Sequence, residues 1–82
     1  MKKYKLVKSD YVIVRGKKLY RIKALRNFGS VKTGYLGGYI ESEFNLSHQG
    51  NAWICDDAKV FGNAQVYGDA LVSGNAKVFG DA

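Results

Sequence analysis

Apolar and polar residues alternate with a strict period of six in the second half of the chain. From Asn51 the repeated phrase is Asn or Asp, Ala, any residue, Val or Ile, any residue, and usually Gly. The full copies are 51–56, 57–62, 63–68, 69–74 and 75–80, and another begins at Asp81-Ala82. Repeats of fixed length are typical of solenoids, so the pattern predicts a solenoid.

The two apolar positions of each hexad are two residues apart, and on a β-strand such residues point to the same face. Each hexad is therefore expected to be a short strand followed by a corner, where Gly accepts positive φ. Three strands and three corners close into a triangular coil of about eighteen residues. The expected stacks between successive coils are Ile54 under Val72, Val60 under Val78, Phe61 under Phe79, and Trp53 under Leu71.

The spacing of aliphatic and small residues resembles the hexapeptide-repeat family, in which a small residue follows an aliphatic one after four places. The matching pairs are Val60 with Ala64, Val66 with Ala70, and Val72 with Ala76. The resemblance implies a left-handed parallel β-helix. The NAxVxG phrases are also similar to arrays in bacterial and phage-encoded proteins of unassigned role. The resemblance covers residues 36–82, although Phe61, Tyr67 and Phe79 stand where acyltransferases of the family often place Gly.

Run backwards, the register places the start of the coil near Leu36, with Leu36 and Ile40 as an inward-facing pair. Residues 42–44 form an incomplete hexad, and His48 occupies an inward position in the irregular repeat 45–50. The expected fold class is all-β, with a basic antiparallel β cap over 1–35 and a β-helix over 36–82. Terminal repeats of a solenoid are irregular because they cap an open end.

The first 35 residues predict antiparallel strands. Residues 11–14 and 19–25 flank 15–18, a hairpin spacing with Gly16 at the turn, and 4–7 predicts a third strand. This head is expected to cap the N-terminal end of the coil. Exposed strand edges recruit partners. The C-terminal end of the coil is therefore expected either to form a homo-oligomer or to continue into a longer array.

Charge is divided sharply along the 82 residues, whose net charge is +6. Eleven of the thirteen Lys and Arg residues lie in the first 32 positions against Asp10 alone, which gives this segment +10. The other two Lys residues face six acids, which gives −4. A single cysteine, Cys55, excludes an internal disulfide and suits the cytoplasm, here of a bacterial host. No run of residues indicates targeting or a membrane partner.

No enzyme, cofactor or metal site is expected. The only histidine is His48, interpreted as a hydrogen-bonded residue at the end of the core, and no Ser/His/Asp set or carboxylate pair accompanies it. Stacked Asn and Asp corners are interpreted as structure, and Gly34, Gly37 and Gly38 as further corners. A fragment of a hexapeptide-repeat acyltransferase is the minor alternative that the resemblance implies.

The predicted function is a non-catalytic protein-interaction module. A rigid coil would present outward columns of aromatic side chains, which usually mark contact surfaces. The column residues are Trp53, Phe61, Tyr67 and Phe79. The alternative is that these rings cover the coil's own faces or meet the head. The resemblance to phage proteins makes a host defence protein, such as a CRISPR effector, the concrete candidate partner, which this chain would inhibit.

The basic head favours a second function, the binding of DNA or RNA, because its cations interleave with Tyr4, Tyr11 and Tyr20. The expected basic patch consists of Lys5, Arg15, Lys17, Lys18, Arg21, Lys23 and Arg26. A solvated face of a small sheet, or docking on an acidic protein surface, would use the same residues.

Overall fold

The chain is all-β in a computed structural model that describes residues 2–80. The strands are β1 (Tyr4–Val14), β2 (Lys17–Ala24), β3 (Leu36–Ile40), β4 (Trp53–Ile54), β5 (Lys59–Gly62), β6 (Leu71–Val72) and β7 (Lys77–Gly80), and a 3-10 turn, η1 (Glu43–Asn45), follows β3. Asp81 and Ala82, where the sixth copy of the hexad begins, lie outside the described residues.

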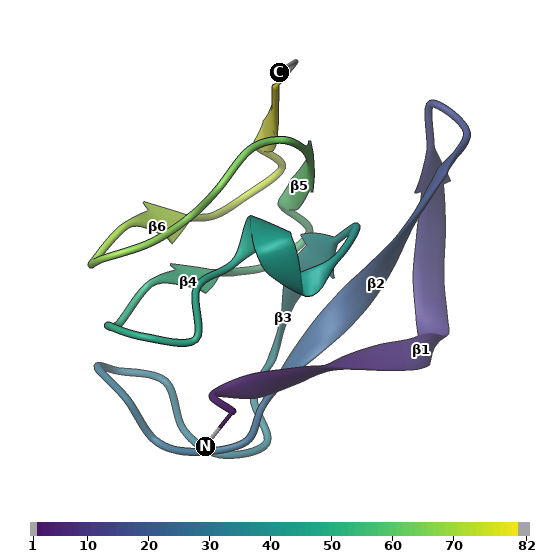
Figure 1. Cartoon of the computed structure of the whole chain (residues 1–82). Coiled ribbons are helices and arrows are strands. Elements are labelled where there is room, and N and C mark those ends of the chain that lie inside the picture. The colour runs from purple at the N-terminus through teal and green to yellow at the C-terminus, as the bar shows by residue number, and fades with distance from the viewer. Residues whose placement is uncertain (1, 81–82) are drawn as a thin grey trace.

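Two sheets organise these strands. A five-stranded mixed sheet has the order β1-β2-β3-β5-β7, antiparallel among its first three strands and parallel from β3 onward, and β4 pairs with β6 in a second, parallel sheet. Figure 1 shows the long β1–β2 hairpin on one side of the molecule and β4 and β6, one above the other, on the opposite side. The head therefore continues directly into the sheet of the repeat region.

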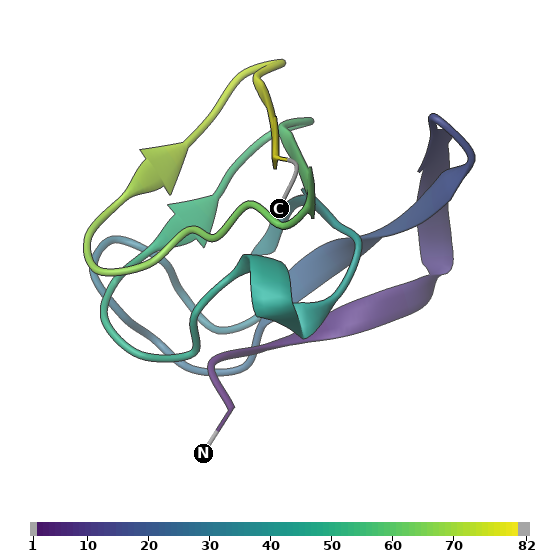
Figure 2. The same ribbon diagram turned by 45° about the horizontal axis from the view of Figure 1, so that its top comes forward.

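Parallel pairing at a separation of eighteen residues confirms the predicted stacks. The pairs in register are Trp53 with Leu71, Ile54 with Val72, Val60 with Val78, Phe61 with Phe79, and Gly62 with Gly80. The rings of Phe61 and Phe79 are 5.1 Å apart between centroids and nearly parallel, at 11°. The hexad period therefore determines which side chains meet between successive layers. Figure 2 shows the two strands of the second sheet, β4 and β6, one over the other.

The first layer departs from this register by two residues. Ile40 pairs with Val60 and Leu46 with Val66, each twenty residues apart. Ile40 and Leu46 are six residues apart, as Val60 and Val66 are, so the two extra residues lie after Leu46. They fall between Ser47, whose N–H donates to the carbonyl of Val66, and Asn51, whose N–H donates to that of Gly68. The expected inward pair is half wrong, because Ile40 is buried and Leu36 is 58% exposed.

The corners recur every six residues in the left-handed backbone region. Residues 50, 56, 62, 68 and 74 all have φ between +57° and +73°. Four of them are Gly, which adopts such φ values without strain, and the fifth is Asp56. Asp56 Oδ2 accepts from the backbone N–H of Gly74, 3.1 Å away in the next layer. The corner therefore survives at the one copy of the hexad that lacks Gly.

Gly37 and Gly38 have a different role from the predicted one. Only Gly34, with φ +93°, lies at a left-handed corner, whereas Gly37 and Gly38 are buried inside β3. A Cβ on Gly38 would lie 2.6 Å from Cγ2 of Ile54, and a Cβ on Gly37 would lie 2.5 Å from the carbonyl oxygen of Ile54. These two glycines are needed because β3 passes very close to the next layer of the coil.

The hairpin forms as predicted, but the separate strand expected at 4–7 is part of it. Arg15 and Gly16 make a two-residue turn in which both have positive φ, the form that matches the twist of paired strands. β1 advances four residues from Val7 to Tyr11 while β2 advances one, so β1 carries a bulge at 8–10. Without the bulge, Tyr20 would share a face with even-numbered residues of β1. With it, Tyr20 shares a face with odd-numbered ones such as Tyr11.

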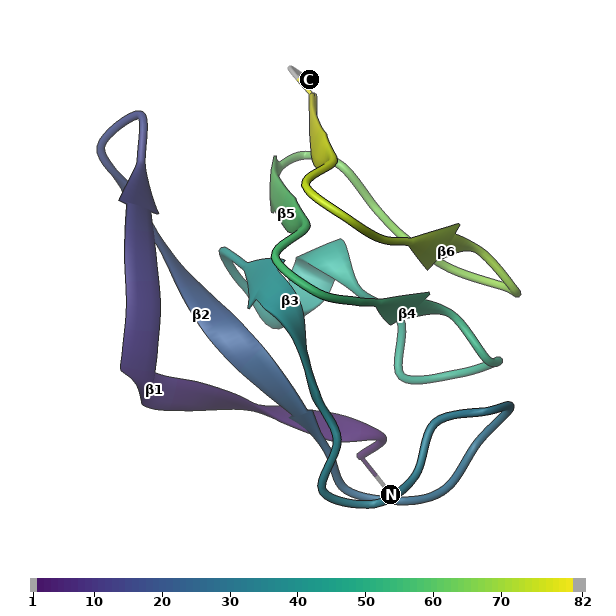
Figure 3. The ribbon, with the colours of Figure 1, turned by 180° about the vertical axis from the view of Figure 1, so that it is seen from behind.

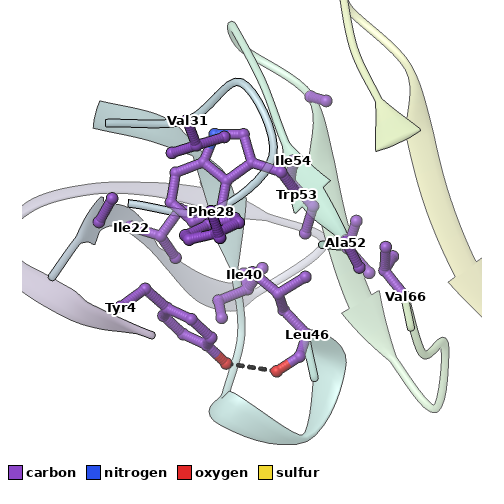
Figure 4. Close-up of a cluster of buried hydrophobic side chains, with 13 residues drawn as sticks. Tyr4, Ile22, Phe28, Val31, Ile40, Leu46, Ala52, Trp53, Ile54 and Val66 are labelled. Carbon is purple, nitrogen blue, oxygen red and sulfur yellow. Dashed lines mark hydrogen bonds between the residues drawn. The ribbon is translucent and has the colours of Figure 1, made fainter. Parts of the chain in front are cut away.

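One hydrophobic core joins the head to the coil (Figure 4). Tyr4, Ile22, Ala24, Phe28 and Val31 come from the head, and Ile40, Leu46, Ala52, Trp53, Ile54, Ala58, Val60 and Val66 come from the repeat region. Trp53 was expected on an outward column, but it is 2% exposed because the head covers it. The edge of its ring meets Phe28, with 5.3 Å between ring centroids.

Candidate interaction surfaces

An open groove of about 460 Å³ lies beside η1. Its lining residues are Glu43, Phe44, Ser47, Gln65, Val66 and Tyr67. Of these, Phe44 and Tyr67 are 55% and 69% exposed. No sequence signal marks this groove, because its lining comes from two segments that are far apart in the sequence, 43–47 and 65–67. Tyr67 alone among the lining residues was expected at a partner surface.

Backbone hydrogen bonds fix the floor of the groove. The N–H of Ser47 donates to the carbonyl of Val66, and the N–H of Val66 donates to the carbonyl of Asn45, both at 2.9 Å. The buried amide of Asn45 donates to the carbonyl of Ala64 at 2.8 Å. The backbone that carries the groove is therefore held in place, which limits the entropy lost when a partner binds.

The predicted column of Phe61 and Phe79 is half buried. Phe61 is 3% exposed, since Leu19 and Tyr39 pack against it in a second small core. Phe79 is 47% exposed, and the guanidinium of Arg15, at the tip of the hairpin, lies 4.6 Å from its ring centroid. Of the four predicted column residues, only Tyr67 and Phe79 are accessible to a partner.

The seven residues of the predicted basic patch divide into two groups. The exposed ones are Lys5, Arg15, Lys17 and Lys18. Half-buried Lys23 lies directly opposite Lys5 across the hairpin, a like-charge pair that disfavours folding slightly. Arg26 donates through Nη2 to the carbonyl of His48 at 3.2 Å. Arg21 forms several hydrogen bonds within the protein. The structure therefore does not bring the seven together as one free surface.

Arg21 fastens β2 to the coil. Its Nε donates to Oδ2 of Asp10 at 2.9 Å and its Nη1 to the carbonyl of Gly37 at 2.6 Å. Nη2 donates to the hydroxyl of Tyr39 and lies 3.5 Å from Oδ1 of Asp57. The side chain is 18% exposed. A guanidinium shared among four groups is committed to the protein's own structure.

Replacing Arg21 with lysine is expected to lower the free energy of unfolding by about 2 kcal/mol, because one ammonium cannot reproduce the planar fork. Urea unfolding followed by Trp53 fluorescence measures the loss. Lys18→Met on the same strand is the control, with an expected change within about 0.5 kcal/mol. Equal stability of Arg21→Lys and the wild type would contradict this role.

The face of the hairpin beyond the bulge is uncovered. We call it the hairpin patch, and it consists of Lys8, Tyr11, Ile13, Lys18 and Tyr20. Tyr11 pairs with Tyr20 and Ile13 with Lys18 in the ladder, so these four share a face. Tyr11 is 48% exposed and Ile13 58%. Figure 3 shows this end of the hairpin rising away from the β4–β6 side of the coil.

His48 is hydrogen-bonded through both ring nitrogens, as expected. Nδ1 accepts from the backbone N–H of Lys3 at 3.1 Å, so Nε2 carries the proton and donates to Oε1 of Glu43 at 2.7 Å. Tyr4 stacks on the imidazole at 4.1 Å. The bond from His48 lowers the pKa of Glu43, burial opposes this, and Lys2 lowers the pKa further. His48 therefore keeps no free lone pair with which to act as a base.

Lys3 is fully buried under the first layer of the coil. Its Nζ donates to the carbonyl of Ala52 at 2.7 Å and to that of Gly50 at 3.4 Å, and lies 4.7 Å from the ring centroid of Phe28. Burial, and to a lesser extent the charge of Arg26, lowers the pKa of Lys3 from 10.5 to about 8. The ammonium thus satisfies carbonyl groups that another strand would otherwise have to pair.

The free energy of unfolding is expected to rise by about 1 kcal/mol between about pH 7.5 and about pH 9. Through this window the unfolded chain keeps the Lys3 proton while the folded protein, with a pKa of about 8, releases it. The cost of burying the charge is therefore fully present below pH 8 and is relieved above it. Burial raises the pKa of Cys55 and of Tyr4, which oppose the rise only above their ordinary values of 9.0 and 10.0.

Urea unfolding at several pH values measures this rise. Lys3→Met, which keeps the length of the side chain without its charge, is expected to remove the rise whatever its effect on absolute stability. A flat profile for the wild type, or an unchanged slope in Lys3→Met, would contradict the assignment.

Neither the single cysteine nor the acidic residues that the structure describes indicate a catalytic or metal site. Cys55 packs against the main core, and burial, aided by the charge of Asp56, raises the pKa of its thiol, which keeps it protonated and unreactive near neutral pH. Residues 2–80 contain no group of three or more His, Cys, Asp or Glu side chains placed to hold a metal ion. Over the same residues, no helix has the length and apolar character needed to cross a membrane.

Comparison of the sequence with known protein families and with curated proteins finds no match. The resemblance to hexapeptide-repeat proteins therefore stays a prediction.

Proposed function

We propose that the chain is a non-catalytic protein-interaction module that binds a segment of a partner protein in the groove beside η1. The observation that carries this proposal is the exposure of two aromatic side chains, Phe44 and Tyr67, in the lining of one groove. Aromatic side chains in a well-defined depression are the residues that most often dominate binding energy at protein interfaces. Glu43, Ser47 and Gln65 add polar groups at the rim.

A rigid scaffold supports this function. We infer that residues 36–80 form a parallel β-helix, since parallel pairing recurs on three sides of the repeat region and corners with positive φ recur every six residues. The resemblance to hexapeptide-repeat proteins implies that this helix is left-handed. Such a coil holds side chains at fixed spacings. The groove then needs little rearrangement on binding, which favours affinity.

The resemblance to phage-encoded repeat proteins gives the proposal a specific form, in which the partner is a bacterial host protein, such as a CRISPR effector, that this chain inhibits. Bacterial lysate is accordingly the source in which to search for the partner.

Capture from nuclease-treated bacterial lysate tests the proposal. One protein is expected to bind in stoichiometric amount, and Phe44→Ser with Tyr67→Ser is expected to abolish the capture. The matched control is Tyr35→Ser, because Tyr35 is 51% exposed but lies outside the groove. Capture that survives the double substitution, or that nuclease removes, would refute the groove as a protein-binding site.

Self-association through the upper edge of the coil is a second, separate proposal. In the last layer of the described residues, Ala70 and Ala76 are exposed and Val72 and Val78 half-buried, although the hexad directs them inward. Another coil with the same pattern, in a second copy or a longer array, would cover them. Solution mass, measured with and without nuclease, separates self-association from co-purified nucleic acid.

A further inference from the structure

We propose that the hairpin patch binds single-stranded nucleic acid, with bases stacked on Tyr11 and Tyr20 and phosphates held by Lys8 and Lys18. The patch shares no residue with the groove beside η1. This inference therefore goes beyond the protein-binding function and does not depend on it.

The two tyrosine rings form a stacking platform on a sheet surface. Tyr11 and Tyr20 are cross-strand partners whose ring centroids are 6.4 Å apart, with their planes tilted by 60°. Tyr11 is 48% exposed and Tyr20 half-buried, and neighbouring Ile13, 58% exposed, extends the apolar surface. Aromatic residues on exposed strands are a recurrent means of binding unpaired bases, since every base has a flat face.

The ammonium groups of two lysines lie over the tyrosine rings on which bases would stack. Nζ of Lys8 lies 4.4 Å from the ring centroid of Tyr20, and Nζ of Lys18 lies 4.5 Å from that of Tyr11. A cation above an exposed ring is held more weakly than a stacked base. Because each ammonium sits on a flexible stem, it can move to a phosphate while a base takes its place on the ring.

The charge around the patch favours a polyanion. The first 32 residues carry eleven cations and one acid, Asp10, and that acid is bound to Arg21. Exposed Lys5 and Arg15 extend the positive surface along the same hairpin, whereas Nζ of Lys17 lies 3.5 Å from Oε2 of Glu41. Charge alone would also suit duplex DNA or an acidic polypeptide. Exposed rings favour unpaired bases over both, because duplex bases are already stacked and an acidic polypeptide offers no bases.

Fluorescence anisotropy at fixed salt tests the choice of ligand. The probe is a labelled mixed-sequence single strand of about twenty nucleotides, as DNA and as RNA, with its duplex and polyglutamate as competitors. Binding of the single strand is expected to be at least about tenfold tighter than binding of either competitor. Equal affinity for the duplex or for polyglutamate, or no binding of the single strand, would overturn the proposal.

Substitutions assign the binding to the patch. Tyr11→Leu is expected to weaken single-strand binding about tenfold, and Tyr11→Phe, which keeps the ring, to leave it near the wild-type value. Lys18→Gln should reduce the steepness of the salt dependence by about one phosphate contact, whereas Lys32→Gln, outside the hairpin, should not. Wild-type Trp53 fluorescence verifies folding of each variant, and wild-type affinity in folded Tyr11→Leu would refute the site.

Discussion

Replacing Gly38 with alanine is expected to lower the free energy of unfolding by about 4 kcal/mol, near the whole stability of a small domain. A Cβ at this position would lie 2.6 Å from Cγ2 of Ile54 and closer still to the carbonyl oxygen of Ala58. The carbonyl belongs to the backbone just before β5, so it cannot move aside without disturbing the layer that it supports. The substitution should therefore leave most of the protein unfolded at room temperature.

Gly16→Ala is the matched control for this prediction. Gly16 has φ +77°, which strains any other residue, but nothing lies within 4 Å of the position of its Cβ. Its expected cost is about 1 kcal/mol, the penalty for a non-glycine residue in the left-handed region. Urea unfolding measures both losses. If Gly16→Ala costs more than Gly38→Ala, backbone conformation rather than close approach limits the fold.

The repeat region could be predicted from the sequence because its structure is encoded locally. Each hexad contains its own inward pair and its own corner, and the period of six alone brings Phe61 onto Phe79. Asp56 illustrates how strong this constraint is. It adopts φ +57° at the one corner where the sequence offers no glycine. The handedness of the coil is not encoded in the period and rests on the resemblance.

The head could not be predicted to the same depth, because its effects act over long distances in the sequence. The bulge at 8–10 decides which face of the hairpin covers the coil, and no local pattern marks it. Trp53 occupies an outward position in its hexad, yet Phe28, from a loop of the head, covers it. The two extra residues of the first layer lie between Ser47 and Asn51, inside the irregular repeat 45–50, where the period gives no register.

The roles of the charged residues also depend on contacts between residues that are far apart in the sequence. A count of cations predicts a basic head, but it cannot tell which cations the fold uses internally. Arg21 reaches Asp57, which is far away in the sequence, and Lys3 reaches the carbonyl of Ala52. The cations left for a partner, such as Lys8 and Lys18, lie over tyrosine rings of the same hairpin, and neither forms an ion pair within the described residues.

Val60→Asp is expected to lower the free energy of unfolding by about 4 kcal/mol or more, because a buried carboxylate there has no partner. Val60 is fully buried in the main core. Val78 stacks directly upon it in the next layer and is only half-buried. Because water reaches Val78, Val78→Asp should cost about 1–2 kcal/mol.

The comparison of these two variants also reports on the upper edge of the coil. They place the same charge in the same hexad position one layer apart, so burial is the main difference between them. Val60→Ala measures the part of the loss due to missing volume, about 2 kcal/mol. Urea unfolding at two protein concentrations completes the test. If Val78→Asp proves as damaging as Val60→Asp only at the higher concentration, a second copy covers Val78, and self-association stabilises the last layer.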